Sequence, residues 1–207
     1  MRNPSRPALL GLGCLLLSGC ALINKADAVI FRYFTPAGVA PASPADSGKG
    51  RGVGLELRLG RVNAATYIKD RIVHRDETRE VTYYDELRWT EKPEDYLRHA
   101  IGRALFEDEG MRELVGRPGA TLEIVLDAFD ELRAPRHVAH VEMTWLVRDE
   151  QTVRLQHSFS VERPIADVKP TKRPNAIAEA MADALAEAVS TIADGVVNEM
   201  SGRHAAN

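Results

Sequence analysis

The chain has 207 residues, with 27 Lys and Arg against 30 Asp and Glu, and a formal net charge of −3. This mildly acidic balance gives no support to nucleic-acid binding or to electrostatic adhesion on anionic lipid. The only two cysteines are Cys14 and Cys20, so residues 21–207 contain no disulfide and no thiolate metal ligand. Because 44% of the residues are hydrophobic, a single domain can still bury an adequate apolar core.

The first 19 residues have the layout of a secretory signal. Arg2 and Arg6 precede an uncharged, largely apolar stretch over residues 8–18. That stretch is shorter than the roughly 20 residues that a helix needs to cross a bilayer. We therefore predict a signal peptide over residues 1–19 that is cleaved, rather than a membrane span.

The signal ends in Leu17-Ser18-Gly19-Cys20, which resembles the bacterial lipobox. Such a motif needs a cysteine because its thiolate is the nucleophile that takes up the lipid. We predict that Cys20 becomes the lipidated N-terminus and that its acyl chains anchor the protein to a membrane. Ala21 follows, instead of the aspartate that commonly retains lipoproteins at the inner membrane. This predicts a location at the periplasmic face of the outer membrane.

Residues 20–54 are predicted to form the lipidated N-terminus and a flexible tether. Residues 35–54 are rich in Pro, Gly, Ala and Ser and have no apolar periodicity. The glycines in this stretch lack the flanking strand, helix and Gly-Lys-Ser/Thr ending of a phosphate loop. We expect one domain over residues 55–200 and a disordered tail over residues 201–207.

The first half of the domain is predicted to hold three strands and a helix. Apolar alternation indicates strands over residues 55–59, 71–75 and 81–89, with Asp85 interrupting the apolar series of the third. Pro93 and the two acids after it begin a helix well, because proline suits the first turn and acids complement the helix dipole there. Gly110 is the expected end of this helix.

The second half is predicted to hold three strands and a long helix. Alternating apolar residues indicate strands over 120–132, 137–148 and 152–162, of which the last two form a β-hairpin. One face of the first of these strands is predicted to hold Leu122, Ile124, Leu126 and Ala128, and one face of the second to hold the alternate residues from Ala139 to Val147. Helical apolar spacing continues from about Pro174 to Met200. The predicted fold is α+β: a mixed, largely antiparallel sheet of about five to six strands with two helices packed on one face.

A search for chemistry selects no catalytic, cofactor-binding or metal-binding residue. His137 and His140 are three residues apart in a strand, which places them on opposite faces and makes a shared metal difficult. His157 falls on the apolar face of its strand, where a hydrogen-bonded core histidine is expected. Nothing selects Asp127 and Asp130 as an acid–base pair. The run Glu107-Asp108-Glu109 at a helix C-terminus is expected to be a solvated, frayed end, or else a contact for a basic partner.

Several features follow one another in a fixed order over residues 55–107 and 120–165. They are the strand LELRLGRV (55–62), Tyr67, Arg88-Trp89 with an acidic-proline helix start, Asp127-x-Phe129, Trp145 and a closing Ala-rich helix. In this order and spacing they resemble the ABC-type transport auxiliary lipoprotein family (PqiC-like proteins). The resemblance implies a non-catalytic protein without a cofactor, which serves ABC permease/ATPase complexes and MCE-domain proteins that carry lipids or solvents between two membranes.

The leading hypothesis is therefore an outer-membrane lipoprotein that docks to an intermembrane ABC/MCE transport system. It is a membrane protein only through its lipid anchor, it does not bind nucleic acid, and it can form a homo-oligomer. A structural or assembly lipoprotein of the cell envelope is the alternative. A periplasmic hydrolase is a third hypothesis, although no catalytic motif favours it.

Overall fold

The computed structural model describes residues 29–36, 50–76, 80–150 and 152–204. Contacts divide the chain into a first unit, Met1–Ile30, and a second unit, Phe31–Asn207. Of the first unit only Val29 and Ile30 are described, so the predicted signal peptide and Cys20 lie outside the described residues. The fold below is that of the second unit.

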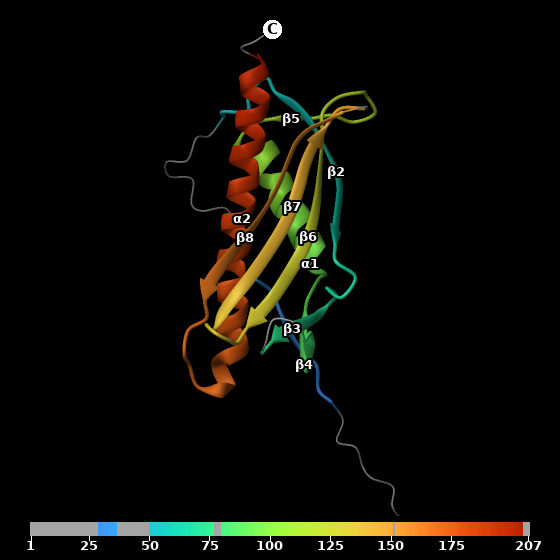
Figure 1. Ribbon diagram of the computed structural model, residues 1–207. Helices are drawn as coiled ribbons and strands as arrows, with labels where there is room; N and C mark the ends of the chain where they lie inside the picture. The colour runs from blue at the N-terminus through green and yellow to red at the C-terminus, as the bar shows by residue number, and fades with distance from the viewer. Residues whose placement is uncertain (1–28, 37–49, 77–79, 151, 205–207) are drawn as a thin grey trace, which may run out of the picture. The chain divides into compact units, whose positions relative to one another are not determined.

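Eight strands of the described residues form one sheet (Figure 1). They are β1 (Arg32–Phe34), β2 (Glu56–Ala64), β3 (Arg71–Arg75), β4 (Thr82–Trp89), β5 (Arg112–Glu113), β6 (Thr121–Leu132), β7 (Val138–Arg148) and β8 (Val153–Pro164). All six predicted strands are confirmed. The two further strands, β1 and β5, have only three and two residues, too few to show an alternating pattern in the sequence.

Both predicted helices are present. Helix α1 (Pro93–Gly102) has proline in its first turn together with Glu94 and Asp95, and it continues as a π-helical segment, η1 (Arg103–Asp108). A short 3₁₀ turn, η2 (Pro170–Lys172), leads into α2 (Arg173–His204). Helix α2 extends to His204, into the predicted disordered tail, of which residues 205–207 lie outside the described residues.

Strand β6 is the centre of the sheet. One of its edges pairs antiparallel with β7 along its whole length, and β7 pairs antiparallel with β8. Its other edge is shared: β2 pairs in parallel with residues 121–126, and β3 pairs in parallel with residues 130–132. From β3 the sheet continues through antiparallel β4 to parallel β1, and from β2 it continues to parallel β5. The predicted α+β class with a mixed sheet is confirmed.

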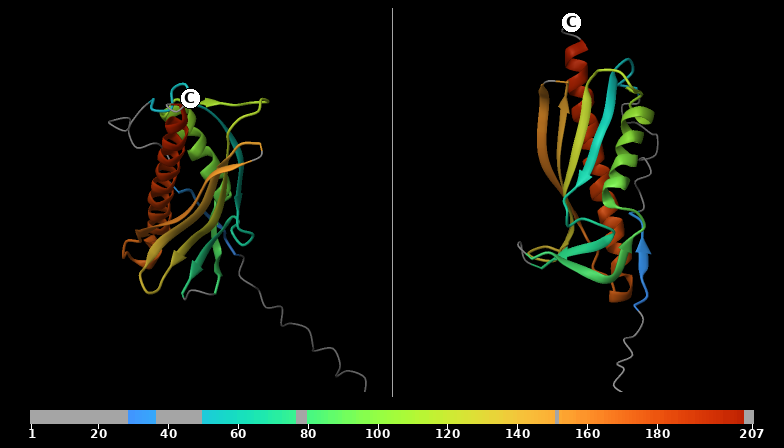
Figure 2. Two further views of the ribbon diagram at one scale, coloured as in Figure 1. Left: turned by 45° about the horizontal axis from the view of Figure 1, so that its top comes forward. Right: turned by 90° about the vertical axis from the view of Figure 1, so that its right-hand side faces the viewer.

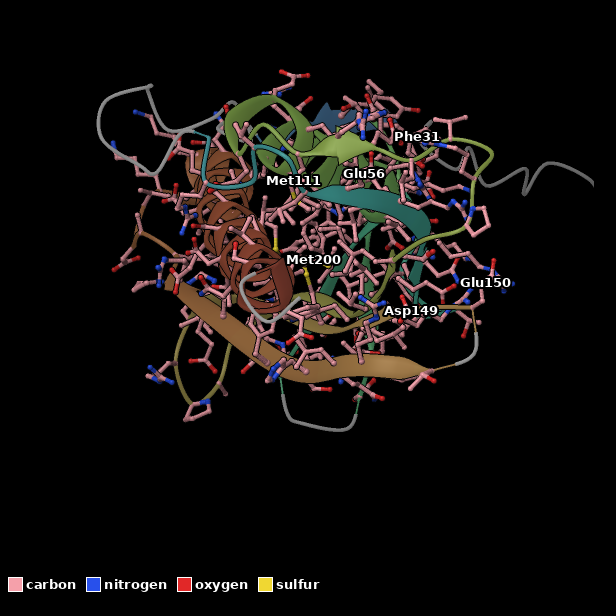
Figure 3. All side chains as sticks on the ribbon, turned by 90° about the horizontal axis from the view of Figure 1, so that it is seen from above. Phe31, Glu56, Met111, Asp149, Glu150 and Met200 are labelled. Atoms are coloured by element: carbon pink, nitrogen blue, oxygen red, sulfur yellow. The ribbon has the colours of Figure 1, made fainter. Side chains whose placement is uncertain are left out.

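The helices cover one face of the sheet (Figure 2, right). Helix α2 packs along β7 and β8, and α1 packs on β2 and against α2. Viewed down α2, side chains fill the space between this helix and the strands, with Met111 and Met200 at the near end (Figure 3). The alternating residues of β7 predicted to share a face, from Ala139 to Val147, are all buried, as this packing requires.

A bulge in β6 changes which residues face the helices. The register with β7 shifts between Leu126 and Ala128, so Ala128 lies opposite exposed Glu142, while Phe129 lies opposite buried Val141. The prediction that Ala128 shares a face with Leu126 was therefore wrong, because one extra residue in a strand reverses the alternation. Phe129 takes its place in the core.

Two parts of the predicted tether are structured in the second unit. Strand β1 pairs with β4, with Arg32 opposite Leu87 and Phe34 opposite Trp89. Residues 50–54 form a turn in which the Gly52 amide donates to the Glu109 carbonyl over 2.9 Å. Neither segment has an apolar period of its own. Each is instead held in place by a partner far along the chain. The intervening residues 37–49 lie outside the described residues.

Helix α2 approaches β7 closely at Gly195. A Cβ atom at this position would lie 2.8 Å from both Cζ2 and Cη2 of Trp145, whose ring is buried. Contacts this short force one of the two groups to move, and in a packed interior that costs about 1–3 kcal/mol. Glycine at this position allows the helix to lie directly on the indole ring.

Gly195→Ala is expected to lower the free energy of unfolding by about 1–2 kcal/mol, although alanine alone favours a helix by about 1 kcal/mol. In a Trp145→Phe background the clash is absent, so the same substitution should be neutral or stabilising. Gly102→Ala in α1, where nothing lies within 4 Å of the added Cβ, is the control and should stabilise by up to about 1 kcal/mol. Urea unfolding measures all three effects. Equal effects of Gly195→Ala in both backgrounds would contradict the packing argument.

Candidate functional site

Two adjacent carboxylates are buried at the end of β6. The side chains of Asp130 and Glu131 are both 0% exposed. Because successive residues of a strand point to opposite faces, the two carboxylates belong to different environments. A buried carboxylate is strongly destabilising unless it is paired and hydrogen-bonded. We call Asp130, Glu131 and their partners the carboxylate cluster.

Asp130 is held by groups from β3 and from the loop before it. Arg75 Nε lies 2.6 Å from Asp130 Oδ2, and Arg75 Nη2 donates to Tyr67 Oη over 2.8 Å. The Tyr67 hydroxyl donates in turn to the carbonyl of Asp127 over 3.0 Å and lies 3.4 Å from Asp130 Oδ2. Burial raises the pKa of Asp130 above its ordinary value of 3.8, and the charge of Arg75 opposes this rise. Burial, aided by the charge of Asp130, also raises the pKa of Tyr67.

Glu131 is held by groups from β4 and from the turn between β6 and β7. The Tyr84 hydroxyl donates to Glu131 Oε2 over 2.6 Å, and His137 Nε2 lies 2.6 Å from Glu131 Oε1. Arg133 Nε lies 3.5 Å from the same carboxylate. Burial, followed by the hydrogen bond to Glu131, raises the pKa of Tyr84 to about 12. Tyr84 therefore stays protonated and remains a donor at all physiological pH values.

The carboxylate cluster joins segments that are distant in the sequence. It connects the loop before β3 with β3 itself, β4, the end of β6 and the turn before β7. Its members are acids, arginines, phenols and a histidine that bind to one another. The carboxylate cluster lies where β6 stops pairing with β2 and begins to pair with β3. Its geometry therefore accounts for a structural role, in which it holds these segments together.

A second ion-pair group holds the turn at residues 50–54. Arg51 Nε donates to Glu109 Oε2 over 3.1 Å, and the same guanidinium contacts Asp194 of α2. The hydrogen bond to Glu109 raises the pKa of Arg51. The prediction of a frayed, solvated end was wrong for Glu109, which is buried. Its position is unfavourable for the helix dipole, but Arg51 compensates from 58 residues away in the chain.

The other candidate residues are not brought together into a catalytic arrangement. Asp127 accepts a hydrogen bond from Thr144 Oγ1 over 2.8 Å, whereas Asp130 faces Arg75. His137 binds Glu131, whereas His140 lies opposite Asp130 in the β6–β7 register, so the two histidines are not brought to one site. His157 was wrongly predicted as a core residue. It is exposed on edge strand β8, with its ring 5.4 Å from that of Trp145.

An aromatic surface lies at the β1 edge of the sheet. Phe31 and Tyr33 are 49% and 62% exposed, and the Arg88 guanidinium lies 4.6 Å from the centre of the Phe31 ring. Further cation–π contacts gather in the same half of the sheet. They are Arg32 over Phe34, Arg71 over Tyr83, Arg75 over Tyr67 and Arg133 over Tyr84. Arginine with aromatic residues is the composition of contact surfaces.

Within the described ranges, none of the helices has the length and apolar character required to cross a membrane. The same residues contain no group of three or more His, Cys, Asp or Glu side chains arranged to hold a metal ion.

Residues 37–193 match the model of a family described as the ABC-type transport auxiliary lipoprotein component. The chain belongs to this family. The resemblance read from the sequence is thereby confirmed, and the protein is an auxiliary component associated with ABC transport. As a lipoprotein component of a transport system, it is associated with the cell envelope.

Two solved structures have a fold similar to that of this ABC-transport auxiliary family member. A crystal structure of a protein from Xanthomonas campestris is similar with a TM-score of 0.71 and 20% identity, covering 85% of this chain and 99% of that chain. A second crystal structure, of an uncharacterized protein, has a TM-score of 0.62 and 13% identity, covering 81% and 99% of the two chains. At these identities the likeness concerns the fold alone. No curated protein matches the sequence.

Several residues that carried the family resemblance make contacts that stabilise the fold. Tyr67 belongs to the carboxylate cluster, and Trp89 packs edge to face on Phe129 with ring centres 5.4 Å apart. Asp127 binds Thr144, and Trp145 lies under Gly195. Sequence reasoning missed Arg75, Tyr84 and Glu131. The available signal was the pair of adjacent acids, Asp130 and Glu131, at the end of a strand, where alternation places one of the two on the core side.

Proposed function

We propose that this ABC-transport auxiliary lipoprotein is anchored to the outer membrane through Cys20, faces the periplasm and docks to an ABC/MCE system that moves lipids or solvents between the two membranes. Its partners are an MCE-domain protein and the ABC permease/ATPase complex. The family match over residues 37–193 carries the proposal, because it places the chain beside ABC transporters as an auxiliary component.

The described domain supports a role in docking rather than in catalysis. Its ionisable clusters are engaged in structural pairs, in which Asp130 and Glu131 bind residues of neighbouring segments. A sheet covered on one face by two helices is suited to present a docking surface at a fixed distance from an anchor.

Cys20→Ala tests the proposal in cells. We expect the variant to fold, because Cys20 precedes the second unit, but to lose its attachment to the membrane and its transport-related function. Circular dichroism, membrane fractionation and a lipid or solvent sensitivity assay measure these three expectations in turn, and mass spectrometry of the N-terminus checks that the lipid is absent. Ser18→Ala, which keeps a small residue before the cysteine, is the matched control and should remain lipidated.

Co-purification from solubilised envelopes tests the partners. The lipidated protein should retain MCE and ATPase components, and Cys20→Ala should lose them in cells. Full activity from an unlipidated Cys20→Ala protein would refute the proposed role of the anchor. Retention of peptidoglycan or an assembly machine without ABC or MCE components would favour the alternative, a structural or assembly lipoprotein.

A further inference from the structure

Strand β1 forms an open margin of the sheet. It pairs with β4 on one side, and among the described residues no strand pairs with its other side (Figure 2, right). In the register, Phe34 lies opposite buried Trp89 and packs against the core. Side chains alternate along a strand, so Tyr33 points to the other side. Phe31, immediately before the strand, lies on the same side because its ring contacts Arg88. There they flank Arg88, which lies opposite Tyr33.

Aromatic rings, rather than net charge, dominate this margin. Arg88 stacks on Phe31 and lies 3.8 Å from Asp70, and the neighbouring Arg71 is paired with Asp85. Arg88 and Arg71 are thus balanced by acids, while Arg32 of β1 lies over the Phe34 ring. Tyrosine accumulates where a membrane meets water, because its ring is apolar and its hydroxyl is polar. Phenylalanine together with arginine is likewise common on surfaces that lie in the headgroup region.

The chain itself restricts how far this margin can lie from Cys20. Phe31 follows Cys20 by eleven residues, which span at most about 40 Å when fully extended. With the domain boundary predicted from the sequence, Leu55 would follow the anchor by 35 residues, or at most about 120 Å. The part of the domain with the shortest covalent connection to Cys20 is therefore also the part with exposed aromatic rings.

We propose that the β1 margin lies against the phospholipid surface that holds the anchor, with Phe31 and Tyr33 in the headgroup region. This inference rests on the proposed lipidation of Cys20. The anchor keeps the margin at high local concentration near the bilayer, so a weak contact is sufficient to orient the domain. The opposite end of the domain then points away from the membrane.

A vesicle experiment tests the orientation. The chain beginning at Cys20 is coupled through this single thiol to a maleimide phospholipid, which supplies an anchor independently of cellular processing. Tyr33→Trp is expected to lose fluorescence in vesicles with brominated acyl chains. Val115→Trp, placed at a 78% exposed apolar residue between β5 and β6, is the control and should keep its emission. Trp89 and Trp145 are buried and give the background.

A second measurement uses the same chain with Cys20 alkylated instead of lipid-coupled. Phe31→Ser with Tyr33→Ser should lower partition into phosphatidylethanolamine–phosphatidylglycerol vesicles about tenfold, as expected when two partly exposed rings lose their apolar contact. Val53→Ser with Val115→Ser removes two apolar side chains that are more exposed than Phe31 and Tyr33, and it should leave the partition into vesicles unchanged. Thermal unfolding checks that both variants fold.

Unquenched Tyr33→Trp, or equal quenching at positions 33 and 115, would overturn the inference. So would equal partition of the two double variants. Shielding of Tyr33→Trp by an added MCE or ABC component, without quenching by lipid, would instead assign the margin to a protein partner. Absence of lipid on Cys20 in protein from cells would refute the proposed anchor alone, because the chemically coupled protein does not depend on it.

Discussion

Arg75→Met is expected to lower the free energy of unfolding by about 3–5 kcal/mol, because it removes the cation beside a carboxylate that has no exposed surface. The substitution also removes the hydrogen bond from Arg75 to Tyr67. Methionine keeps much of the arginine's apolar volume, so the loss reports the charge and the hydrogen bond. Urea unfolding followed by circular dichroism measures it.

Arg71→Met is the matched control on the same strand. Arg71 pairs with Asp85 at the surface, where such pairs contribute about 1 kcal/mol or less. Adding Asp130→Asn to Arg75→Met should recover much of the loss, since no buried charge then remains. Equal losses for Arg75→Met and Arg71→Met would show that the carboxylate cluster does not stabilise the fold.

The loss from Arg75→Met should also decrease at acid pH. The pKa of Asp130 in the folded protein lies above its ordinary value of 3.8, so the folded state keeps this proton to higher pH than the unfolded chain. The contribution of Asp130 to stability therefore falls as pH rises from 3.8 through the folded pKa. The charge of Arg75 lowers the pKa of Asp130, so its removal raises that pKa further. The pH range over which Asp130 loses stability then extends to higher pH. The variant thus regains stability relative to the wild type as pH falls.

Phe129→Ala is expected to cost about 3–5 kcal/mol of unfolding free energy. The Phe129 ring is 1% exposed and contacts Trp89 edge to face, so its removal leaves a cavity and an aromatic ring without its neighbour. Chemical denaturation measures the loss, and xenon or benzene binding tests for the cavity. If Phe129→Ala does not fold, Phe129→Leu remains measurable, with an expected loss of about 1.5 kcal/mol or less.

Phe159→Ala is the control for the core position. Phe159 lies on edge strand β8 and is only half-buried, so its truncation should cost clearly less, about 1–2 kcal/mol. Equal losses at positions 129 and 159 would contradict the conclusion that the bulge in β6 directs Phe129 into the core.

The long regular elements could be predicted from sequence because their periodicity is local. The β7–β8 hairpin and α2 each repeat an apolar pattern over many residues, and both are found where expected. Strand β1 could not be predicted in this way. Its three residues become a strand only by pairing with β4, more than 50 residues further along the chain. The bulge at residues 126–128 is also invisible in the pattern, because Leu126 and Ala128 continue the same apolar alternation.

The candidate site was less predictable than the fold for the same reason. Asp130 and Glu131 are two acids at the end of a strand, and the sequence alone favours solvent for both. Their burial depends on Arg75, Tyr84 and His137, which reach them from three different segments. Likewise, Glu109 was expected to be solvated because its partner Arg51 belongs to a glycine-rich stretch without any regular pattern.

The sharing of one β6 edge by β2 and β3 has a consequence for the order of assembly. Strands β6, β7 and β8 are neighbours in the sequence and pair antiparallel, so their contacts close short loops and form early. Strands β2 and β3 are synthesised before β6 and cannot pair with it until residues 121–132 are available. We therefore expect the C-terminal half, from β6 to α2, to serve as the template on which the N-terminal half folds. Pairing of β1, the strand nearest to Cys20 in the sequence, with β4 is then the last step.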